Sequence, residues 1–147
     1  MNIVELLEKE EGFREKAYYC SEGYPTIGIG WLIGRKGQPL DDFKAMTICK
    51  EAARAQLKDE VGIIERALFR ELPFYKLLNR NRQMVLISMA YQLGVTGLLK
   101  FKKMMTAIEC GDYTSAAREG LDSRWRKQTP SRAGRHMDAL LAGKWNN

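Results

Sequence analysis

Residues 13–34 read FREKAYYCSEGYPTIGIGWLIG, and this stretch differs in character from the rest of the chain. Tyrosine, threonine and isoleucine, which favour strands, are concentrated in it, and Glu22-Gly23 supplies a turn. We therefore predict a small antiparallel sheet here, followed by a loop from Gly34 to Pro39. From position 26 the pattern has a period of two, which predicts a strand over residues 26–30. One face of this strand is expected to carry Thr26, Gly28 and Gly30, and the other Ile27, Ile29 and Trp31.

A short helix is predicted immediately before the sheet. Asn2 followed by Glu5 resembles a capping box, and Gly12 is a typical residue for a helix end. Position 11 lies four residues after Leu7 and shares its apolar face. The pattern therefore places one carboxylate, that of Glu11, on an apolar helix face at the point where the helix ends.

Helices are predicted over most of the chain after the sheet. Thr47 is expected to cap a long helix that runs to about Arg70 and stops before Pro73. Residues 82–93 are apolar nearly all round, which is typical of a helix buried on all sides. The clearest apolar stripe of the long helix is Leu57, Val61, Ile64 and Leu68. The further predicted helices lie near residues 97–109, 114–121 and 130–142, the last with Pro130 in its first turn.

The chain has 147 residues, which is enough for one domain with a substantial core. Its composition, 45% hydrophobic and 29% charged, is that of an ordinary soluble globular protein. We predict a single, mainly helical α+β domain over residues 1–147, in which a long helix joins a small antiparallel sheet lobe to a larger helical lobe. A cleft between lobes is a usual place for a ligand. The predicted parts are residues 13–46 for the sheet lobe, 47–70 for the connecting helix, and 71–147 with 1–11 for the helical lobe.

Cysteine and histidine usage argues against a disulfide framework and against a metal site. Cys20, Cys49 and Cys110 are an odd number and widely spaced, which fits a reducing compartment. His136 is the one histidine, so no metal or other cofactor is expected. Three charged residues among the first nine interrupt any signal peptide, and no apolar run approaches the roughly 18 residues of a membrane span. We expect the protein to stay in the cytoplasm of the cell that makes it until something releases it.

The net charge of +6 is unevenly distributed along the chain. Residues 1–99 carry 14 Lys/Arg and 13 Asp/Glu, whereas residues 100–147 carry 10 and 5. A basic last third indicates either a polyanionic partner or solubility alone. A nucleic-acid partner is not expected, because such a charge cluster is most often a solvated face and no nucleic-acid-binding motif accompanies it. The cluster is Arg124, Arg126, Lys127, Arg132 and Arg135.

The last predicted helix has two readings. Residues 130–145 mix basic and apolar side chains, as a weak basic amphipathic helix does, which predicts weak contact with anionic envelope lipids. The other reading, a core helix packed on its lobe, explains the same pattern and is the stronger one. Nothing in the chain indicates an oligomer, so a monomer is expected.

Glu11 is the first candidate for acid–base chemistry. Partial desolvation of its charged form favours a protonated carboxyl, which a general acid needs. On position alone, a solvated or salt-bridged glutamate is the commoner reading, because residues 5–11 contain four acids.

The glycine-rich strand is the second candidate. Gly28 and Gly30 remove side chains from the face that carries Thr26, so an extended substrate can approach the backbone and the Thr26 hydroxyl can hold a water. A glycine-rich edge strand with a bulge explains the pattern equally well. Aromatic residues suit stacking on sugar rings, although such residues are usually core. They are Tyr18, Tyr24, Trp31, Tyr91 and Trp125.

Several short motifs follow one another in a recognisable order and spacing. They are Met1-Asn2-Ile3, Glu11-Gly12, Glu22-Gly23-Tyr24, Thr26-Ile27-Gly28-Ile29-Gly30, Ser123-Arg124-Trp125, Gln128-Thr129-Pro130 and Arg132. By these motifs the chain resembles the T-even bacteriophage lysozyme family over nearly its whole length. The similarity thins at residues 33–46, where the loop is shorter than in the best-known relatives.

The resemblance implies a phage endolysin that hydrolyses the β-1,4 bond between N-acetylmuramic acid and N-acetylglucosamine and thereby lyses its host. The family's catalytic pattern is a Glu, eight residues, an Asp or sometimes a Cys, five residues, then a Thr, and Glu11, Cys20 and Thr26 fit it. Glu11 is then the general acid, while Cys20 and Thr26 manage the attacking water. The family inverts configuration, which requires room for that water.

The resemblance also implies a set of residues that contact the substrate. An arginine matching Arg132 pairs with the catalytic glutamate in relatives, whereas Trp31 stands where relatives often have histidine. The implied partner is the glycan strand of peptidoglycan, reached in the periplasm with the help of a separate membrane-pore protein. The implied substrate-binding residues are Gly30, Trp31, Leu32, Tyr91, Gln92, Leu93, Gly94, Ser123, Trp125 and Arg132.

Cys20 leaves the mechanism open. An ordinary thiol is mostly neutral at neutral pH, whereas the usual aspartate is ionised. Cys20 is therefore a thiolate acting as base or nucleophile, or a side chain that only shapes the site, or an inert residue in a catalytically inactive peptidoglycan-binding relative. A nucleophilic thiolate would give retention of configuration rather than inversion.

Overall fold

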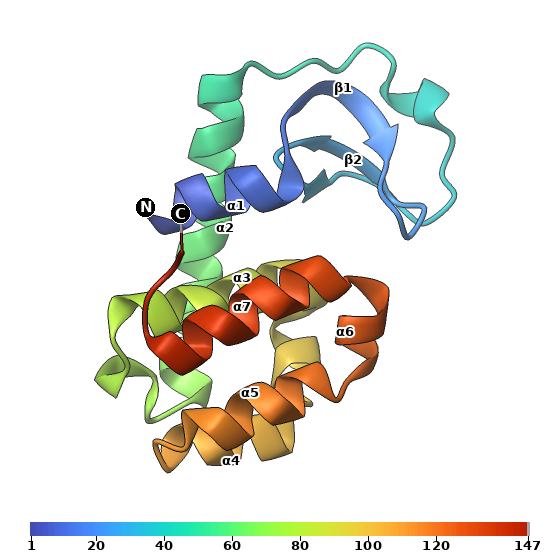
Figure 1. Cartoon of the computed structure of the whole chain (residues 1–147). Coiled ribbons are helices and arrows are strands. Elements are labelled where there is room, and N and C mark those ends of the chain that lie inside the picture. Colours follow the sequence, from blue (N-terminus) through green and yellow to red (C-terminus); the bar gives the residue numbers. More distant parts are fainter. Residues whose placement is uncertain (147) are drawn as a thin grey trace. The chain divides into compact units, whose positions relative to one another are not determined.

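A computed structural model describes residues 1–146 and divides the chain into two compact units, Met1–Gly62 and Ile63–Asn147 (Figure 1). The first unit contains a three-stranded antiparallel sheet and the second is helical. The predicted class, mainly helical α+β with a small antiparallel sheet, is confirmed. In this division residues 1–11 belong to the same unit as the sheet, whereas the sequence analysis assigned them to the helical lobe. The predicted lobe boundaries stay predictions.

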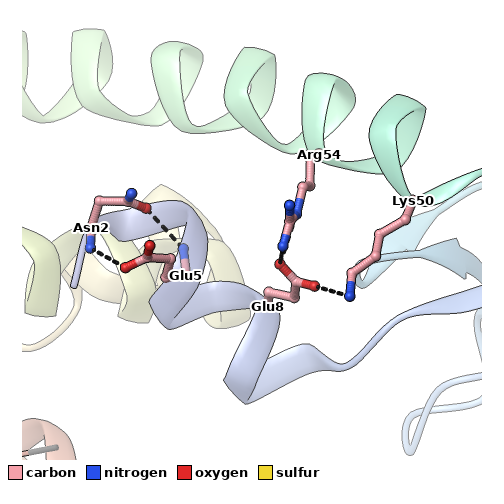
Figure 2. Close-up of polar contacts among 5 residues, drawn as sticks. All are labelled: Asn2, Glu5, Glu8, Lys50 and Arg54. Atoms are coloured by element: carbon pink, nitrogen blue, oxygen red, sulfur yellow. Dashed lines mark hydrogen bonds and ion pairs between the residues drawn. The ribbon is translucent and has the colours of Figure 1, made fainter.

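Helix α1 spans Ile3–Glu11 and has both predicted ends. The Glu5 backbone N–H donates to Asn2 Oδ1 at 2.9 Å, and the Asn2 N–H donates to Glu5 Oε2 at 3.0 Å (Figure 2). The capping box is therefore confirmed, since each side chain satisfies a backbone donor that the helix leaves free. The helix ends at Gly12, whose φ of +72° suits glycine.

A carboxylate on α1 pairs with the start of α2 (Lys50–Glu71). Glu8 Oε1 lies 2.9 Å from Lys50 Nζ, and Glu8 Oε2 lies 2.7 Å from Arg54 Nη2 (Figure 2). Hydrogen bonds from Lys50 and Arg54 hold the pKa of Glu8 below its usual value of 4.5.

Replacing Glu8 by glutamine is expected to remove a pH-dependent part of the stability. The pKa of Glu8 is lowered in the folded state, so its contribution is fully present above about pH 4.5. The contribution disappears as the pH falls through the lower, folded-state value. At pH 7 we expect a loss of about 0.5–1 kcal/mol, kept small because Lys50 and Arg54 are half exposed.

The measurement is the free energy of unfolding of wild type and Glu8→Gln between pH 2 and pH 7. Glu22→Gln, at an exposed turn position, is the control and should leave the unfolding free energy nearly unchanged. A difference between wild type and Glu8→Gln that stays constant over the whole pH range would contradict the role of the carboxylate charge.

The sheet consists of β1 (Arg14–Tyr19), β2 (Pro25–Gly28) and β3 (Trp31–Leu32), in that order and all antiparallel. The prediction of one strand over residues 26–30 is wrong, because Ile29 and Gly30 form the turn that reverses the chain into β3. Gly28 and Gly30 both have positive φ, near +67° and +68°, which favours glycine and permits the tight reversal. The expected alternation of faces therefore stops at Gly28.

Helix α2 begins at Lys50 and not at the predicted cap, Thr47. Thr47 instead forms an isolated antiparallel bridge with Lys16, and the Ile48 N–H donates to the Glu15 carbonyl at 3.0 Å. Pairing with the sheet edge keeps this backbone extended and delays the helix. The predicted stripe of α2 is confirmed as buried: Leu57, Val61, Ile64 and Leu68.

The second unit is built around α3 (Arg80–Leu99). Seven successive residues of this helix, 84–90, are buried, which confirms a core helix that is covered on all sides. A break at Gly94, with φ near +78°, interrupts its regular backbone. The predicted helix over 97–109 is corrected, because residues 97–99 complete α3 and α4 spans Lys102–Glu109.

The remaining helices are α5 (Tyr113–Leu121), α6 (Arg124–Gln128) and α7 (Pro130–Ala142). Helix α7 has the predicted bounds and packs against α3, α5 and α6 (Figure 1). Sequence analysis missed α6, because five residues are too few for a periodic signal.

Among residues 1–146, no single helix is long and apolar enough to cross a membrane. Helices α3 and α4 together meet the length and composition requirement only as a pair bent by 98°, and the centre of α3 is buried within the protein.

Candidate active site

Glu11 is the last residue of α1, and its side chain turns toward the reversal between β2 and β3. A Cβ atom built on Gly30 would lie 3.0 Å from Glu11 Oε2 and 3.1 Å from Glu11 Cγ. The carboxylate therefore lies directly against the Gly30 backbone, at a position where other residues would collide with it. The sequence placed these residues separately, and only the fold brings them into contact.

Cys20 and Thr26 are both held by the backbone of Tyr24. The Tyr24 N–H donates to Cys20 Sγ at 3.4 Å, and the Thr26 hydroxyl donates to the Tyr24 carbonyl at 2.8 Å. The same carbonyl accepts the Cys20 N–H at 3.0 Å. Because the proton of the Thr26 hydroxyl is used in this bond, Oγ1 has only acceptor capacity left, which suits it to receive a hydrogen bond from a water.

Tyr18 belongs to the same group, although the sequence analysis named it only as an aromatic residue that suits stacking on a sugar ring. It pairs directly with Thr26 across β1 and β2, so the two side chains share a face of the sheet. Burial raises the pKa of Tyr18, and the negative charge of the nearby Glu11 carboxylate raises it further. Arg14 opposes this shift, with its Cζ 4.8 Å from the ring centre.

The turn between β2 and β3 carries the remaining predicted residues of the first unit. Trp31 is half-buried, whereas Leu32 is 52% exposed. Thr26, by contrast, is only 1% exposed. The structure thus groups Glu11, Cys20, Thr26, Gly30, Trp31 and Leu32 within one unit.

The second unit groups other predicted residues around Trp125. The Trp125 Nε1–H donates to Gln92 Oε1 at 2.9 Å, and Gln92 Nε2 donates to Thr129 Oγ1 at 3.3 Å. The Ser123 hydroxyl oxygen accepts the Arg126 N–H at 3.2 Å and thereby caps the N-terminus of α6. Side-chain bonds therefore link Gln92 of α3 to Trp125 of α6 and to Thr129, which follows that helix.

Four predicted residues of the second unit lie on α3 and α7. Tyr91 and Leu93 are half-buried on α3, and Gly94 forms the break in that helix. Arg132 is buried in the first turn of α7, where it bonds to Ser88. The substrate-binding roles of all these residues stay predictions.

No group of three or more His, Cys, Asp or Glu side chains within residues 1–146 is arranged to hold a metal ion.

A carboxylic acid at a helix end, set against a strand reversal beside a thiol and a hydroxyl, occurs here in a mainly helical α+β fold. These features define the class of the protein as a mainly helical, lysozyme-like α+β fold. Comparison with known sequences leads to the family itself. The chain belongs to the phage lysozyme family, whose model matches residues 8–144.

Individual relatives are similar to nearly the whole of this chain, but the share of their own length that aligns differs. The chain is 37% identical to the pre-baseplate central spike protein Gp5 of Enterobacteria phage T4, an alignment that covers 97% of this chain and 28% of that protein. It is 30% identical to the endolysin of Salmonella phage P22, over 95% of this chain and 88% of the endolysin. It is 28% identical to the probable T4-type lysozyme 1 of Dictyostelium discoideum, over 99% and 96%. The chain thus spans little more than a quarter of the spike protein.

Proposed function

We propose that this protein hydrolyses the β-1,4 bond between N-acetylmuramic acid and N-acetylglucosamine in bacterial peptidoglycan. The observation that carries the proposal is the Glu11 carboxylate, held against Gly30 in the unit that also contains Cys20 and Thr26. Membership of the phage lysozyme family supports peptidoglycan as the substrate.

In this proposal Glu11 is the general acid that protonates the leaving glycosidic oxygen. Thr26 Oγ1 accepts a hydrogen bond from the attacking water, because its own proton is donated to the Tyr24 carbonyl. Attack by water opposite the leaving group inverts the configuration at the anomeric carbon.

Cys20 is proposed to act as an acceptor beside the water. Its sulfur accepts the Tyr24 N–H, and a carboxylate at the same position can accept that bond equally well. Cys20→Asp is therefore expected to retain activity, whereas Cys20→Ala should lose about tenfold or more of kcat, as the loss of a group that assists proton transfer does.

Rates of reducing-end release measure this prediction, with Cys49→Ser, at an exposed cysteine, as the control that keeps full activity. If Cys20→Ala is as active as wild type, the thiol takes no part in the reaction. A covalent intermediate trapped on Cys20, with retention of configuration, would replace the water mechanism by a nucleophilic one.

The proposal is tested by identifying the sugar at each new reducing end. Purified peptidoglycan is digested, the products are reduced with borohydride, and the reduced amino sugars are separated. Cleavage of the proposed bond yields reduced N-acetylmuramic acid. Reduced N-acetylglucosamine would contradict the proposed bond. Binding to the polymer without any release would instead support the alternative, a catalytically inactive peptidoglycan-binding relative.

We propose lysis of the bacterial host as the biological role, as the name endolysin of two relatives suggests. The protein then stays in the host cytoplasm until release and acts on the wall from the periplasm. The 37% identity to a central spike protein favours a second role, as the wall-degrading part of a virus particle. Detection of the chain in purified particles would support the second role, and its presence only in lysates the first.

The proposed enzyme works as a monomer, without a cofactor and without a nucleic-acid partner. Weak contact with anionic lipids stays a prediction. It is disfavoured by the packing of α7, because Met137 and Leu140 are buried within the protein and cannot reach a membrane surface. Leu141, which is exposed, is the apolar side chain that α7 leaves for such contact. Lack of binding to anionic vesicles at low salt would remove this part of the proposal.

A further inference from the structure

Ser88, Arg132 and His136 form a closed circuit of hydrogen bonds inside the second unit. Arg132 Nη2 donates to Ser88 Oγ at 3.2 Å. Ser88 Oγ lies 2.7 Å from His136 Nε2, and His136 Nδ1 lies 2.8 Å from the backbone carbonyl of Arg132. Ser88 and His136 are completely buried and Arg132 is 8% exposed, so the circuit is shielded from water.

The proton positions of this circuit follow from its chemistry. A carbonyl oxygen only accepts, so His136 Nδ1 must carry the proton that it donates to Arg132. In a neutral imidazole Nε2 is then an acceptor, and the Ser88 hydroxyl donates to it. The Ser88 oxygen in turn accepts from the Arg132 guanidinium. Arg132 Nη2 also donates to the Ser88 backbone carbonyl at 3.4 Å. Through Ser88 and His136, the guanidinium is thus connected to the backbone carbonyl of Arg132 itself.

The position of Arg132 is unfavourable for a cation. It is the third residue of α7, in the first turn, where the helix dipole is positive. Burial of a charged group adds a further penalty. Features that break local rules in this way are expected at functional sites. The circuit offsets part of the penalty by giving the guanidinium a buried acceptor.

The same histidine also supports a second predicted substrate-binding residue. The His136 ring makes an edge contact with Trp125, with ring centres 6.1 Å apart at 86°. Trp145 contacts His136 as well, with ring centres 5.0 Å apart at 88°. Trp125 is bonded through its Nε1–H to Gln92. One buried imidazole thus touches both Arg132 and Trp125.

We propose that Ser88 and His136 are positioning residues, which hold the Arg132 guanidinium for binding of the glycan. The inference rests on the proposed function, because it assigns Arg132 to the substrate. Neither Ser88 nor His136 contacts the substrate, and both act through Arg132.

A double-mutant cycle between Ser88 and Arg132 tests the proposal. KM and kcat are measured on soluble peptidoglycan fragments for wild type, Ser88→Ala, Arg132→Ala and the double variant. We expect KM to rise about tenfold in Arg132→Ala and about fivefold in Ser88→Ala, in the range that losing one hydrogen bond allows. The double variant should be no worse than Arg132→Ala alone, because Ser88 acts only through Arg132. Ser131→Ala, an exposed serine of the same helix, is the control.

The tautomer of His136 is a second and independent measurement. The chain contains one histidine, so its ¹⁵N imidazole signals need no assignment by mutation. We expect Nδ1 protonated and Nε2 unprotonated in wild type near neutral pH, and a change in the Nε2 signal in Ser88→Ala. The opposite tautomer would overturn the circuit, and additive losses of Ser88→Ala and Arg132→Ala would overturn the positioning role.

Failure of the proposed function is distinguishable from failure of this inference. If wild type releases no reducing ends, the same cycle is measured as dissociation constants for the soluble fragments. Non-additive losses in that cycle support the positioning role in a glycan-binding protein, and additive losses or unchanged binding overturn it.

Discussion

Replacing Glu11 by glutamine is expected to lower the release of reducing ends from peptidoglycan on the order of a hundredfold or more. Glutamine has the shape of glutamate but no proton to transfer to the glycosidic oxygen. Glu11 ends α1, and the capping box at the start of that helix does not depend on its side chain. The variant should therefore fold as wild type does and still bind the polymer.

The control is Glu15→Gln, which removes an exposed carboxylate on the neighbouring strand β1 and should keep full activity. Thermal unfolding of both variants shows whether either has lost stability. If Glu11→Gln keeps more than a third of the wild-type rate, Glu11 is not the general acid and the proposed mechanism is wrong.

Replacing Gly30 by alanine is expected to have the second largest effect, a loss of kcat of about tenfold to a hundredfold through misplacement of the acid. A Cβ at this position would lie 3.0 Å from Glu11 Oε2 and 3.2 Å from Glu11 Cδ. Contacts this short require the Glu11 side chain to shift by a few tenths of an ångström away from the turn between β2 and β3. The φ of +68° adds backbone strain, which destabilises the fold by about 1–2 kcal/mol.

Gly37→Ala separates these two effects. Gly37 has a φ of +77°, and nothing lies within 4 Å of a Cβ built there. It therefore suffers similar backbone strain without any contact with Glu11. We expect both variants to lose similar stability in denaturant unfolding and only Gly30→Ala to lose activity. Equal losses of kcat in the two variants would show that strain, and not displacement of Glu11, is responsible.

Local features of the fold were predictable from the sequence because their causes lie within a few residues. The capping box of α1 joins residues three apart, and Pro130 in the first turn of α7 has a φ that suits a helix start. The burial of residues 84–90 of α3 was predictable because a helix that is apolar nearly all round is stable in water only when it is covered.

The errors occurred where contacts distant along the chain outweighed local preference. Thr47 is a good helix cap, but its backbone pairs with Lys16 at the sheet edge, thirty-one positions earlier. The alternation from Thr26 predicted one continuous strand, but the chain reverses at Ile29 and Gly30 so that β3 pairs with β2. The alternation of residue types is the same for one continuous strand and for two strands joined by a tight turn at a glycine, so it could not locate the reversal.

For the candidate site, the sequence by itself determined the chemical groups and their spacing. Glu11, Cys20 and Thr26 were identified from residue types in a family-like pattern, and the family is now shown. Only the tertiary structure decided what surrounds them: Gly30 against the Glu11 carboxylate, and Tyr18 across from Thr26. It also decided the bond between Ser88 and His136, which are 48 positions apart. The physical reason is that propensity, capping and periodicity act over one or two turns. The packing of the half-buried Glu11 carboxylate or the buried His136 imidazole instead depends on which distant residues the fold brings within a few ångströms of it.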